Sequence, residues 1–433
     1  MDAGVISLVL FALLLSLLAS GLWVAPTLLA VGFVALAGFS SAPAGSLLAS
    51  TVWDASWNWA LTALPLFVWM GEILFRTRLS SDMFNGLAPW VARLPGGLLH
   101  VNIVGCGVMA AVAGSSAVTC ATVGRMSMPE LRRRGYDETL AIGTLAGSGT
   151  LGLLIPPSIM LIVYGVVAQQ SISRLFIAGI APGILIICIF MAYVMVRAKL
   201  NPALAPDAGP RTTFMDKLRA SRLLFPVMGL IMAVLGSIYG GYATPTEAAT
   251  VGVVGALVLA HLTGSLTRAS FIESLMGAVR TSCMIAFILA GAAFMSIAMG
   301  FTGVPRVLAS YVDAWQLSPG MLILLLTILY IFLGCFLDGV SMMVLTAAVV
   351  LPMVQAAGID LLWFGIFTVI VVEMAQITPP VGFNLFVLQS MTGRDLLQVT
   401  KAAAPFFVLM LLSILFISVF PNFILWPVQY MVQ

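Results

Sequence analysis

The stretch Gly147-Ser-Gly-Thr-Leu-Gly-Leu-Leu-Ile-Pro-Pro-Ser158 decides how this chain folds, because it interrupts one of the most apolar regions of the sequence. The turn Gly114-Ser-Ser-Ala-Val-Thr119 is a similar interruption shortly before it. Both regions are hydrophobic enough to lie in lipid, yet Gly, Ser and paired Pro break the helical hydrogen bonding. Lipid cannot satisfy the freed backbone groups, so such a break persists only where it is buried in protein or lines a wet cavity. The two breaks therefore predict a binding site for an ion or a polar solute.

A second copy of this arrangement follows at an offset of 223 residues, measured from Pro156 to Pro379. The sequence thus predicts two related halves, each with a re-entrant hairpin followed by a broken helix that carries a double proline. The segments that correspond at this offset are Pro156-Pro157 with Pro379-Pro380, Ala181-Pro182 with Ala404-Pro405, Gly97 with Gly320, and Ser115-Ser116 with Asp338-Gly339.

The composition places the chain in a membrane. Of its 433 residues, 61% are hydrophobic and 8% are charged, against about 25% charged in soluble domains. The apolar runs are continuous rather than alternating, which favours transmembrane helices over a β-barrel. No cluster of Lys and Arg is interleaved with aromatic residues, so no nucleic-acid surface is predicted. The five cysteines show no C-x-x-C spacing, which argues against a disulfide framework or a metal site.

We therefore predict an all-α polytopic membrane protein with two inverted-topology repeats. The repeats span residues 1–196 and 223–433, and a cytoplasmic linker spans 197–222. The hairpins are predicted at about 98–128 and 320–356, and the broken helices at about 138–168 and 361–390.

The distribution of Lys and Arg sets the orientation of these segments. The basic run Arg132-Arg-Arg134 and the basic linker mark the cytoplasmic side by the positive-inside rule. The first hairpin then enters from the cytoplasm and the second from the periplasm, so the halves are inverted. Of the 19 Lys and Arg residues, only Arg174 and Arg306 lie outside in this topology.

Two connecting regions carry further expectations. Residues 43–58 are rich in small residues and Trp, which indicates a loop at the depth of the interfacial aromatic belt. Residues 264–280 are polar enough to predict a separate connection before a crossing at 281–300.

The chemistry of the breaks gives two sets of candidate site residues. Free carbonyls and hydroxyls suit Na⁺, and free helix N-termini suit a carboxylate. The alternatives are close helix packing through small residues at 114–116 and, for the polar residues of the second break, satisfaction of backbone freed by proline. The Na⁺ candidates are Gly114, Ser115, Thr119, Gly152, Pro156, Gly339, Thr378 and Gly382, and the substrate candidates are Ser116, Asp338, Thr378 and Asn384.

Three carboxylates lie in or next to the apolar runs. Asp338 and Glu373 are placed deepest, and carboxylates within a membrane are functional by default. Glu373 has the alternative role of a residue at a helix seam. Glu247 follows Thr244-Pro-Thr246 at a predicted helix start, where a helix-capping role is as well supported as a functional one.

Several other function classes are excluded. Gly147-Ser-Gly-Thr-Leu-Gly152 matches G-x-G-x-x-G, but no strand-turn-helix context surrounds it, so nucleotide binding is not predicted. No G-K-[ST] occurs, and no Ser/His or paired-Asp constellation converges at one depth, so neither an ATP-driven motor nor an enzyme is expected. A purely structural scaffold would not need two matched polar breaks.

At these residues the chain resembles the large membrane subunit of tripartite ATP-independent periplasmic (TRAP) transporters, within the wider ion transporter superfamily. The resemblance extends over nearly the whole chain. The segments that carry it are Leu64–Leu74, Ala113–Gly124, Leu153–Ser158, Ala243–Ala249 and Ile377–Phe386. Cys120 departs mildly from the small or hydroxyl residue expected there.

The resemblance implies an elevator-type carrier in the bacterial inner membrane, with a transport domain of hairpins and broken helices that slides against a scaffold. It also implies Na⁺ as the coupling ion without any other cofactor, a small four-helix membrane subunit, and a periplasmic binding protein that delivers an organic acid. The alternative is a stand-alone ion or organic-acid carrier of the same superfamily. The substrate itself is not predicted, since Arg125, the nearest cation, reads as an interfacial anchor of the hairpin.

Overall fold

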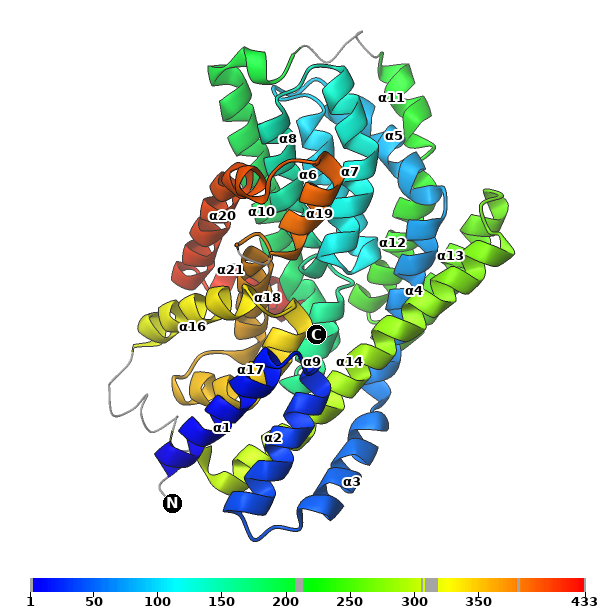
Figure 1. The fold of residues 1–433 in the computed structure, drawn as a ribbon. Helices are drawn as coiled ribbons and strands as arrows, with labels where there is room; N and C mark the ends of the chain where they lie inside the picture. The colour runs from blue at the N-terminus through cyan, green and yellow to red at the C-terminus, as the bar shows by residue number, and fades with distance from the viewer. Residues whose placement is uncertain (1–2, 207–212, 305–306, 308–317, 380–381, 432–433) are drawn as a thin grey trace.

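The fold is entirely helical over the residues that the computed structural model describes, 3–206, 213–304, 307, 318–379 and 382–431 (Figure 1). The first part of the chain contains α1 (Ala3–Ala19), α2 (Val24–Phe39), α3 (Ala44–Ser56), η1 (Trp59–Thr62), α4 (Ala63–Arg76), α5 (Leu79–Val91), α6 (Leu99–Ala113), α7 (Ser116–Arg133), α8 (Glu138–Gly149), η2 (Thr150–Leu153), α9 (Ile159–Val167) and α10 (Ile172–Leu200). The rest contains η3 (Pro202–Leu204), α11 (Phe214–Ser221), α12 (Phe225–Tyr239), α13 (Pro245–Leu262), α14 (Arg268–Thr302), α16 (Pro319–Gly334), α17 (Gly339–Ala356), α18 (Leu361–Ala375), α19 (Phe383–Thr392), α20 (Leu396–Val419) and α21 (Asn422–Met431).

Six helical segments among the described residues are long and apolar enough to cross a membrane, and the bent pair α11 and α12 would make a seventh. The six are η1 with α4, α10, α13, α14, α17 and α20. The arms α6, α8, α9, α16, α18 and α19 are shorter, each with at most 16 residues. A helix of that length falls short of the roughly 20 residues that span a bilayer. Short apolar arms of this kind are typical of hairpins and broken helices.

The chain is interrupted at each of the four predicted breaks. Helix α6 ends at Gly114, whose φ of 57° lies in the left-handed region that favours glycine, and α7 begins two residues later. The second hairpin turns over residues 335–338, between α16 and α17. Residues 154–158 separate η2 from α9, and residues 376–382 separate α18 from α19, with Pro380 outside the described residues.

Two expectations about connecting segments are wrong. Residues 43–58 contain the helix α3 rather than a loop, although Trp53 on it and Trp57 at its C-cap are exposed, as interfacial residues would be. Residues 264–280 do not form a separate connection, because α14 runs without interruption for 35 residues. A capping box between Thr267 and Ser270 starts this helix, and polarity alone does not end a helix that lacks Pro.

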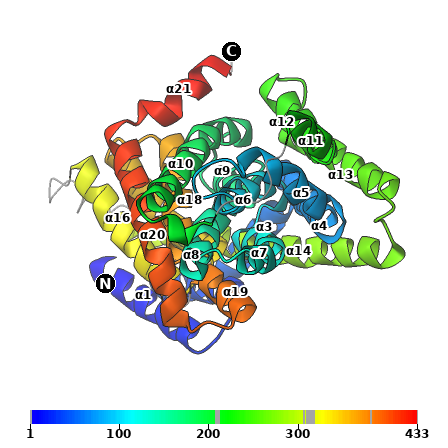
Figure 2. The same cartoon turned by 90° about the horizontal axis from the view of Figure 1, so that it is seen from above.

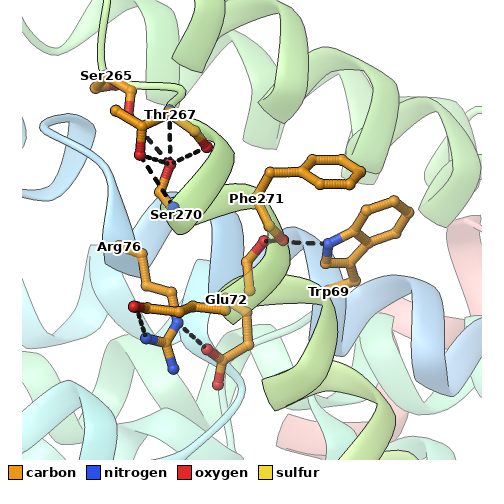
Figure 3. Close-up of polar contacts among 9 residues, drawn as sticks. Trp69, Glu72, Arg76, Ser265, Thr267, Ser270 and Phe271 are labelled. Carbon is orange, nitrogen blue, oxygen red and sulfur yellow. Dashed lines mark hydrogen bonds and ion pairs between the residues drawn. The ribbon is translucent and has the colours of Figure 1, made fainter.

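The polar beginning of α14 is held by α4 (Figure 3). Arg76 of α4 donates to Glu72 at 2.9 Å on its own helix and to Glu273 of α14 at 2.9 Å. The indole of Trp69 donates to the hydroxyl of Ser274 at 3.3 Å. These contacts supply the polar side chains at the start of α14 with hydrogen-bond partners on α4. The polar residues can therefore be part of the helix.

Helix α18 lies at the centre of the helices that form the hairpins and broken helices. Every residue from Leu362 to Ala375 is buried, and α18 packs against α9, α10, α16, α17 and α20 (Figure 2). Beside it, α8 and α20 approach closely at glycine positions. A methyl group at Gly143 would lie 2.9 Å from Cε2 of the buried Phe406 and would overlap the carbonyl of Ala402.

The substitution Gly143→Ala should therefore destabilise the protein. Overpacking a tight interface costs about 1–3 kcal/mol, so the thermal unfolding midpoint in detergent should fall by several degrees. The matched control is Gly236→Ala on α12, where nothing lies within 4 Å of the added methyl group. That variant should unfold at the wild-type temperature or slightly above it, since Ala favours a helix. Equal midpoints for both variants would contradict the tight packing of α8 on α20.

Candidate functional site

The tip of the first hairpin contacts the break of the first broken helix. A methyl group at Gly152 in η2 would lie 2.6 Å from the carbonyl oxygen of Ser115 and 2.8 Å from the backbone nitrogen of Ser116. Only glycine allows this approach, so the backbone of η2 and the backbone of the tip are in direct contact. The hydroxyl of Thr119, one turn into α7, is buried and has no hydrogen-bond partner.

The second hairpin rests its tip on the end of α18 in the same way. A methyl group at Gly339 would lie 2.5 Å from Val372 Cγ1, 3.3 Å from Gln376 Nε2 and 3.7 Å from Leu153 Cδ1. The thiol of Cys335 donates to the carbonyl of Pro379 at 3.1 Å. Because Leu153 belongs to the first broken helix, the second tip reaches the first break as well as its own.

Two side-chain hydrogen bonds join the two halves of the chain at these breaks. The backbone N–H of Leu153 donates to Oε1 of Glu373 at 2.7 Å, across 220 residues of sequence. Asn384 donates from Nδ2 to the hydroxyl of Ser116 at 2.7 Å, across 268 residues. Both bonds are buried, so all four interruptions meet in one junction inside the protein.

The substrate candidates have different positions in this junction. Ser116 and Asn384 are buried and directly bonded, and Oδ1 of Asn384 has no partner. Asp338 is half-buried and caps α17 by accepting from the backbone N–H of Ser341 at 3.1 Å. Thr378 is half-buried and donates to the carbonyl of Met374 at 2.9 Å. This bond matches the alternative role, in which the side chain satisfies a backbone group near the prolines.

The Na⁺ candidates divide into two groups. Gly114, Ser115, Thr119 and Gly152 lie where the first tip meets the first break, and Pro156 packs near Gly179 of α10 on the far side of that break. In the second group, a methyl group at Gly382 would lie 2.6 Å from the carbonyl oxygen of Gln376 and 2.9 Å from that of Thr378.

The described residues hold no cluster of His, Cys, Asp and Glu that could bind a metal. A cation here would be held by carbonyls and hydroxyls, the hard oxygen donors that suit an alkali ion.

Three residues outside the candidate sets are explained by the structure. Glu247 forms a capping box with Thr244 at the exposed start of α13, which confirms its capping alternative. Cys120 packs tightly on α8, where a methyl group at Gly149 would lie 2.7 Å from its Cβ. Arg125 is exposed and lies over the ring of Phe75 at 5.7 Å, so it links the hairpin to α4.

The junction also depends on residues that the sequence did not single out. Leu153 supplies the N–H that Glu373 binds, and Ser158 caps α9 while its hydroxyl donates to the carbonyl of Leu153. The Pro-Pro-Ser pattern at residues 156–158 marks the break, but nothing in it shows which distant carboxylate completes the hydrogen bonding. Only the depth of Glu373 in an apolar run pointed to its importance.

An ion-pair network closes one edge of the same group of helices. Glu138, the first residue of α8, accepts from Nε of Arg132 at 2.9 Å and from Nε of Arg394 at 3.1 Å. These guanidinium groups, Arg394 foremost, hold the pKa of Glu138 below its usual range. A cavity of about 320 Å³ lies beside this network and is lined by Glu138, Thr139, Ile142, Arg394, Gln398, Lys401 and Ala402. The network joins the end of the first hairpin to the segment after the second broken helix.

Comparison with known families identifies the chain. Residues 11–423 match the family described as "Tripartite ATP-independent periplasmic transporter, DctM component". The chain belongs to this family. It is therefore the large permease subunit of a TRAP transporter, a multi-pass membrane protein, one component of a tripartite system and not an enzyme.

Curated relatives agree with this assignment. The chain is 32% identical to the C4-dicarboxylate TRAP transporter large permease protein of Pseudomonas aeruginosa, over 86% of this chain and 87% of that protein. It is 31% identical to the sialic acid TRAP transporter large permease protein of Vibrio cholerae, over 85% and 86%. It is 30% identical to the ectoine/5-hydroxyectoine TRAP transporter large permease protein of Ruegeria pomeroyi, over 82% of each chain.

A solved structure shares the fold without close sequence similarity. The YdaH transporter of Alcanivorax borkumensis superposes with a TM-score of 0.66 at 16% identity and covers 90% of each chain. MtrF of Neisseria gonorrhoeae superposes less closely, with a TM-score of 0.52 at 13% identity over 88% of this chain and 83% of that one. The helical architecture is thus shared beyond the family.

The Ser116–Asn384 hydrogen bond should be detectable as energetic coupling. We expect Ser116→Ala and Asn384→Ala each to lower the thermal unfolding midpoint, and the double variant to lower it by less than their sum. Residues in direct contact typically couple by about 0.5–3 kcal/mol. The control pair is Ser116→Ala with Ser16→Ala, where Ser16 is a residue of α1 whose hydroxyl bonds only its own helix, and these effects should add. Additive effects of Ser116→Ala and Asn384→Ala would contradict the bond.

The pKa of Glu138 predicts how pH affects the edge network. Because its folded-state pKa is lowered, its stabilising contribution is present above the ordinary value of 4.5 and is lost as the pH falls through the folded value. Glu138→Gln should therefore lower the unfolding midpoint by a few degrees at pH 7, and the difference from wild type should shrink to zero at strongly acidic pH. Asp54→Asn is the control, since Asp54 is exposed and makes no ion pair in the described part of the chain. A difference for Glu138→Gln that does not change with pH would contradict this account.

Proposed function

We propose that this chain is the permease of a Na⁺-coupled importer that takes up an organic acid across the bacterial inner membrane. A periplasmic binding protein delivers the substrate, and a small four-helix membrane subunit completes the complex. The single observation that carries the proposal is the buried junction of four helix breaks, in which side-chain oxygens of Thr119, Glu373 and Asn384 have no hydrogen-bond partner. Sites of this kind suit a cation and an anionic solute together.

The substrate class follows from the relatives. Their names specify C4-dicarboxylate, sialic acid, ectoine and isethionate as transported compounds. Each of these carries a carboxylate or, in isethionate, a sulfonate. A polar junction of helix ends favours such a group, because helix N-termini present free N–H donors.

Charge arithmetic supports coupling to a cation gradient. Moving a dianion inward against a membrane potential of ~100 mV costs about 4.6 kcal/mol, and each accompanying Na⁺ returns about 2.3 kcal/mol. More than two Na⁺ therefore make the step electrically downhill. The sequence contains no P-loop, so an ion gradient is the energy source that remains.

The packing of the helices supports an elevator mechanism. Hairpins and broken helices pack on one another around α18, whereas α14 packs along α2, α3 and α4, and α13 along α4 and α12 (Figure 1). We propose that the first group, which contains the junction, moves as the transport domain against the second group. Such a movement carries the site across the membrane without unfolding it.

Reconstitution tests the proposal. A thermal-shift screen of the cognate binding protein with C4-dicarboxylates, sialic acid and ectoine identifies the substrate. Proteoliposomes that contain this chain and the small subunit should then take up that substrate only with the binding protein present and an inward Na⁺ gradient.

Replacement of Na⁺ by choline should abolish uptake. Equal uptake driven by a proton gradient alone, without Na⁺, would contradict the coupling ion. Uptake by this chain in the absence of both other components would instead support the stand-alone carrier.

A further inference from the structure

Glu373 is a fully buried carboxylate with incomplete hydrogen bonding. It lies near the end of α18, one turn before the second break, and its exposed fraction is 0%. Its Oε1 accepts from the backbone N–H of Leu153, and its Oε2 has no hydrogen-bond partner. No Lys, Arg or His within the described ranges forms an ion pair with it, since every ion pair found there involves other acids.

The ionised form of this carboxyl group needs a positive charge beside it, whereas the protonated form is neutral. An ionised carboxylate removed from water costs several kcal/mol, and one neutral N–H donor offsets only part of that cost. Buried charges in proteins are paired or lie beside bound cations. Because no described Lys, Arg or His forms an ion pair with Glu373, a bound cation is the group that would balance its ionised form.

The first break is the place where such a cation would lie. The N–H that Glu373 accepts belongs to the peptide that follows Gly152, and Gly152 is in contact with the first hairpin tip at Ser115. The backbone amide of Leu154 and the hydroxyl of Thr150 also lie close to the same carboxyl group. Glu373, from the second half of the chain, is thus fixed against the backbone whose carbonyls are candidate ligands in the first half.

The other deep carboxylate does not occupy an equivalent position. Asp338 is half-buried, and its carboxylate caps its own helix by accepting from Ser341. That cap satisfies Asp338 locally at the surface of the second hairpin tip. The two acids therefore differ: Asp338 caps its own helix, whereas Glu373 has no ion-pair partner among the described residues.

We infer that Glu373 is a positioning residue for a monovalent cation at the first break: it fixes the Gly152–Leu153 peptide and supplies the negative charge that balances the ion. This inference rests on the proposed Na⁺ coupling and deepens it. Because Glu373 lies in the second half, cation binding in the first half and the packing of α18 on η2 become one coupled equilibrium. The cation then stabilises the contact between the two halves.

A purely structural role makes a different prediction from this one. If Glu373 served only to cap the Leu153 N–H, the amide oxygen of Gln would replace its carboxylate without consequence for ion binding. If the charge matters, Glu373→Gln should keep the fold and weaken the response to Na⁺. The substitution thus separates the hydrogen bond from the charge.

The experiment measures thermal unfolding of the full-length chain in detergent as NaCl replaces choline chloride at constant ionic strength. Wild type should be stabilised by Na⁺, because an ion that binds only the folded state raises its stability. In Glu373→Gln the Na⁺ concentration for half-maximal stabilisation should rise at least tenfold, while the midpoint in choline chloride should equal or exceed that of wild type. Two controls should keep the wild-type Na⁺ dependence: Thr368→Val, a buried position of the same helix, and Glu247→Gln, an exposed helix cap.

A second measurement does not depend on whether the variant folds. In wild type, Na⁺ should slow hydrogen exchange in a peptide that covers residues 150–158, and an equal concentration of choline should not. Two results would overturn the role of Glu373 alone. One is a half-maximal Na⁺ concentration that is unchanged in Glu373→Gln. The other is hydrogen exchange in this peptide that does not change with Na⁺ although Na⁺ stabilises wild type. Wild type that shows no response to Na⁺ in either measurement would overturn both this inference and the proposed Na⁺ coupling.

Discussion

Backbone groups that leave a helix inside an apolar region must find partners within the protein, and the rest of this structure follows from that constraint. Two hydrogen bonds at the breaks come from the other half of the chain. The N–H of Leu153 is bound by Glu373, and the hydroxyl of Ser116 is bound by Asn384. The junction therefore forms only when both halves are folded against each other, which makes the polar site and the core one structural unit.

Close approach of backbone to backbone is the second requirement of this junction. Gly152 permits the first tip to contact η2, and Gly339 permits the second tip to contact α18. A methyl group at either position would overlap atoms of the neighbouring segment. The small residues thus allow close helix packing, and the same close packing brings together the surfaces of the candidate site. The two interpretations of these residues are therefore compatible.

The sequence was informative about where the helices break and less so about what each break contacts. The recurrence of Pro156-Pro157 and the positions of Gly114 and Asp338 located the interruptions, since Gly and Pro act locally on the backbone. The partnership of Glu373 with Leu153 spans 220 residues and depends on how α18 packs, which no local pattern encodes. Interfacial and polar composition alone predicts no helix at residues 44–56 or at the start of α14, whereas a capping box and a cross-helix ion pair stabilise the start of α14. The division into inverted repeats and the individual roles of the site residues stay predictions.

The uninterrupted length of α14 has a consequence for the whole molecule. At 1.5 Å per residue its 35 residues extend over roughly 52 Å, whereas the hydrocarbon layer is about 30 Å thick. The helix must lean strongly or protrude into the aqueous layer, and its Arg76-bound beginning is the polar end suited to protrude. Hydrophobic mismatch and the headgroup region then fix its depth in the bilayer. Because α14 packs along α4, both helices are held at that depth relative to the bilayer.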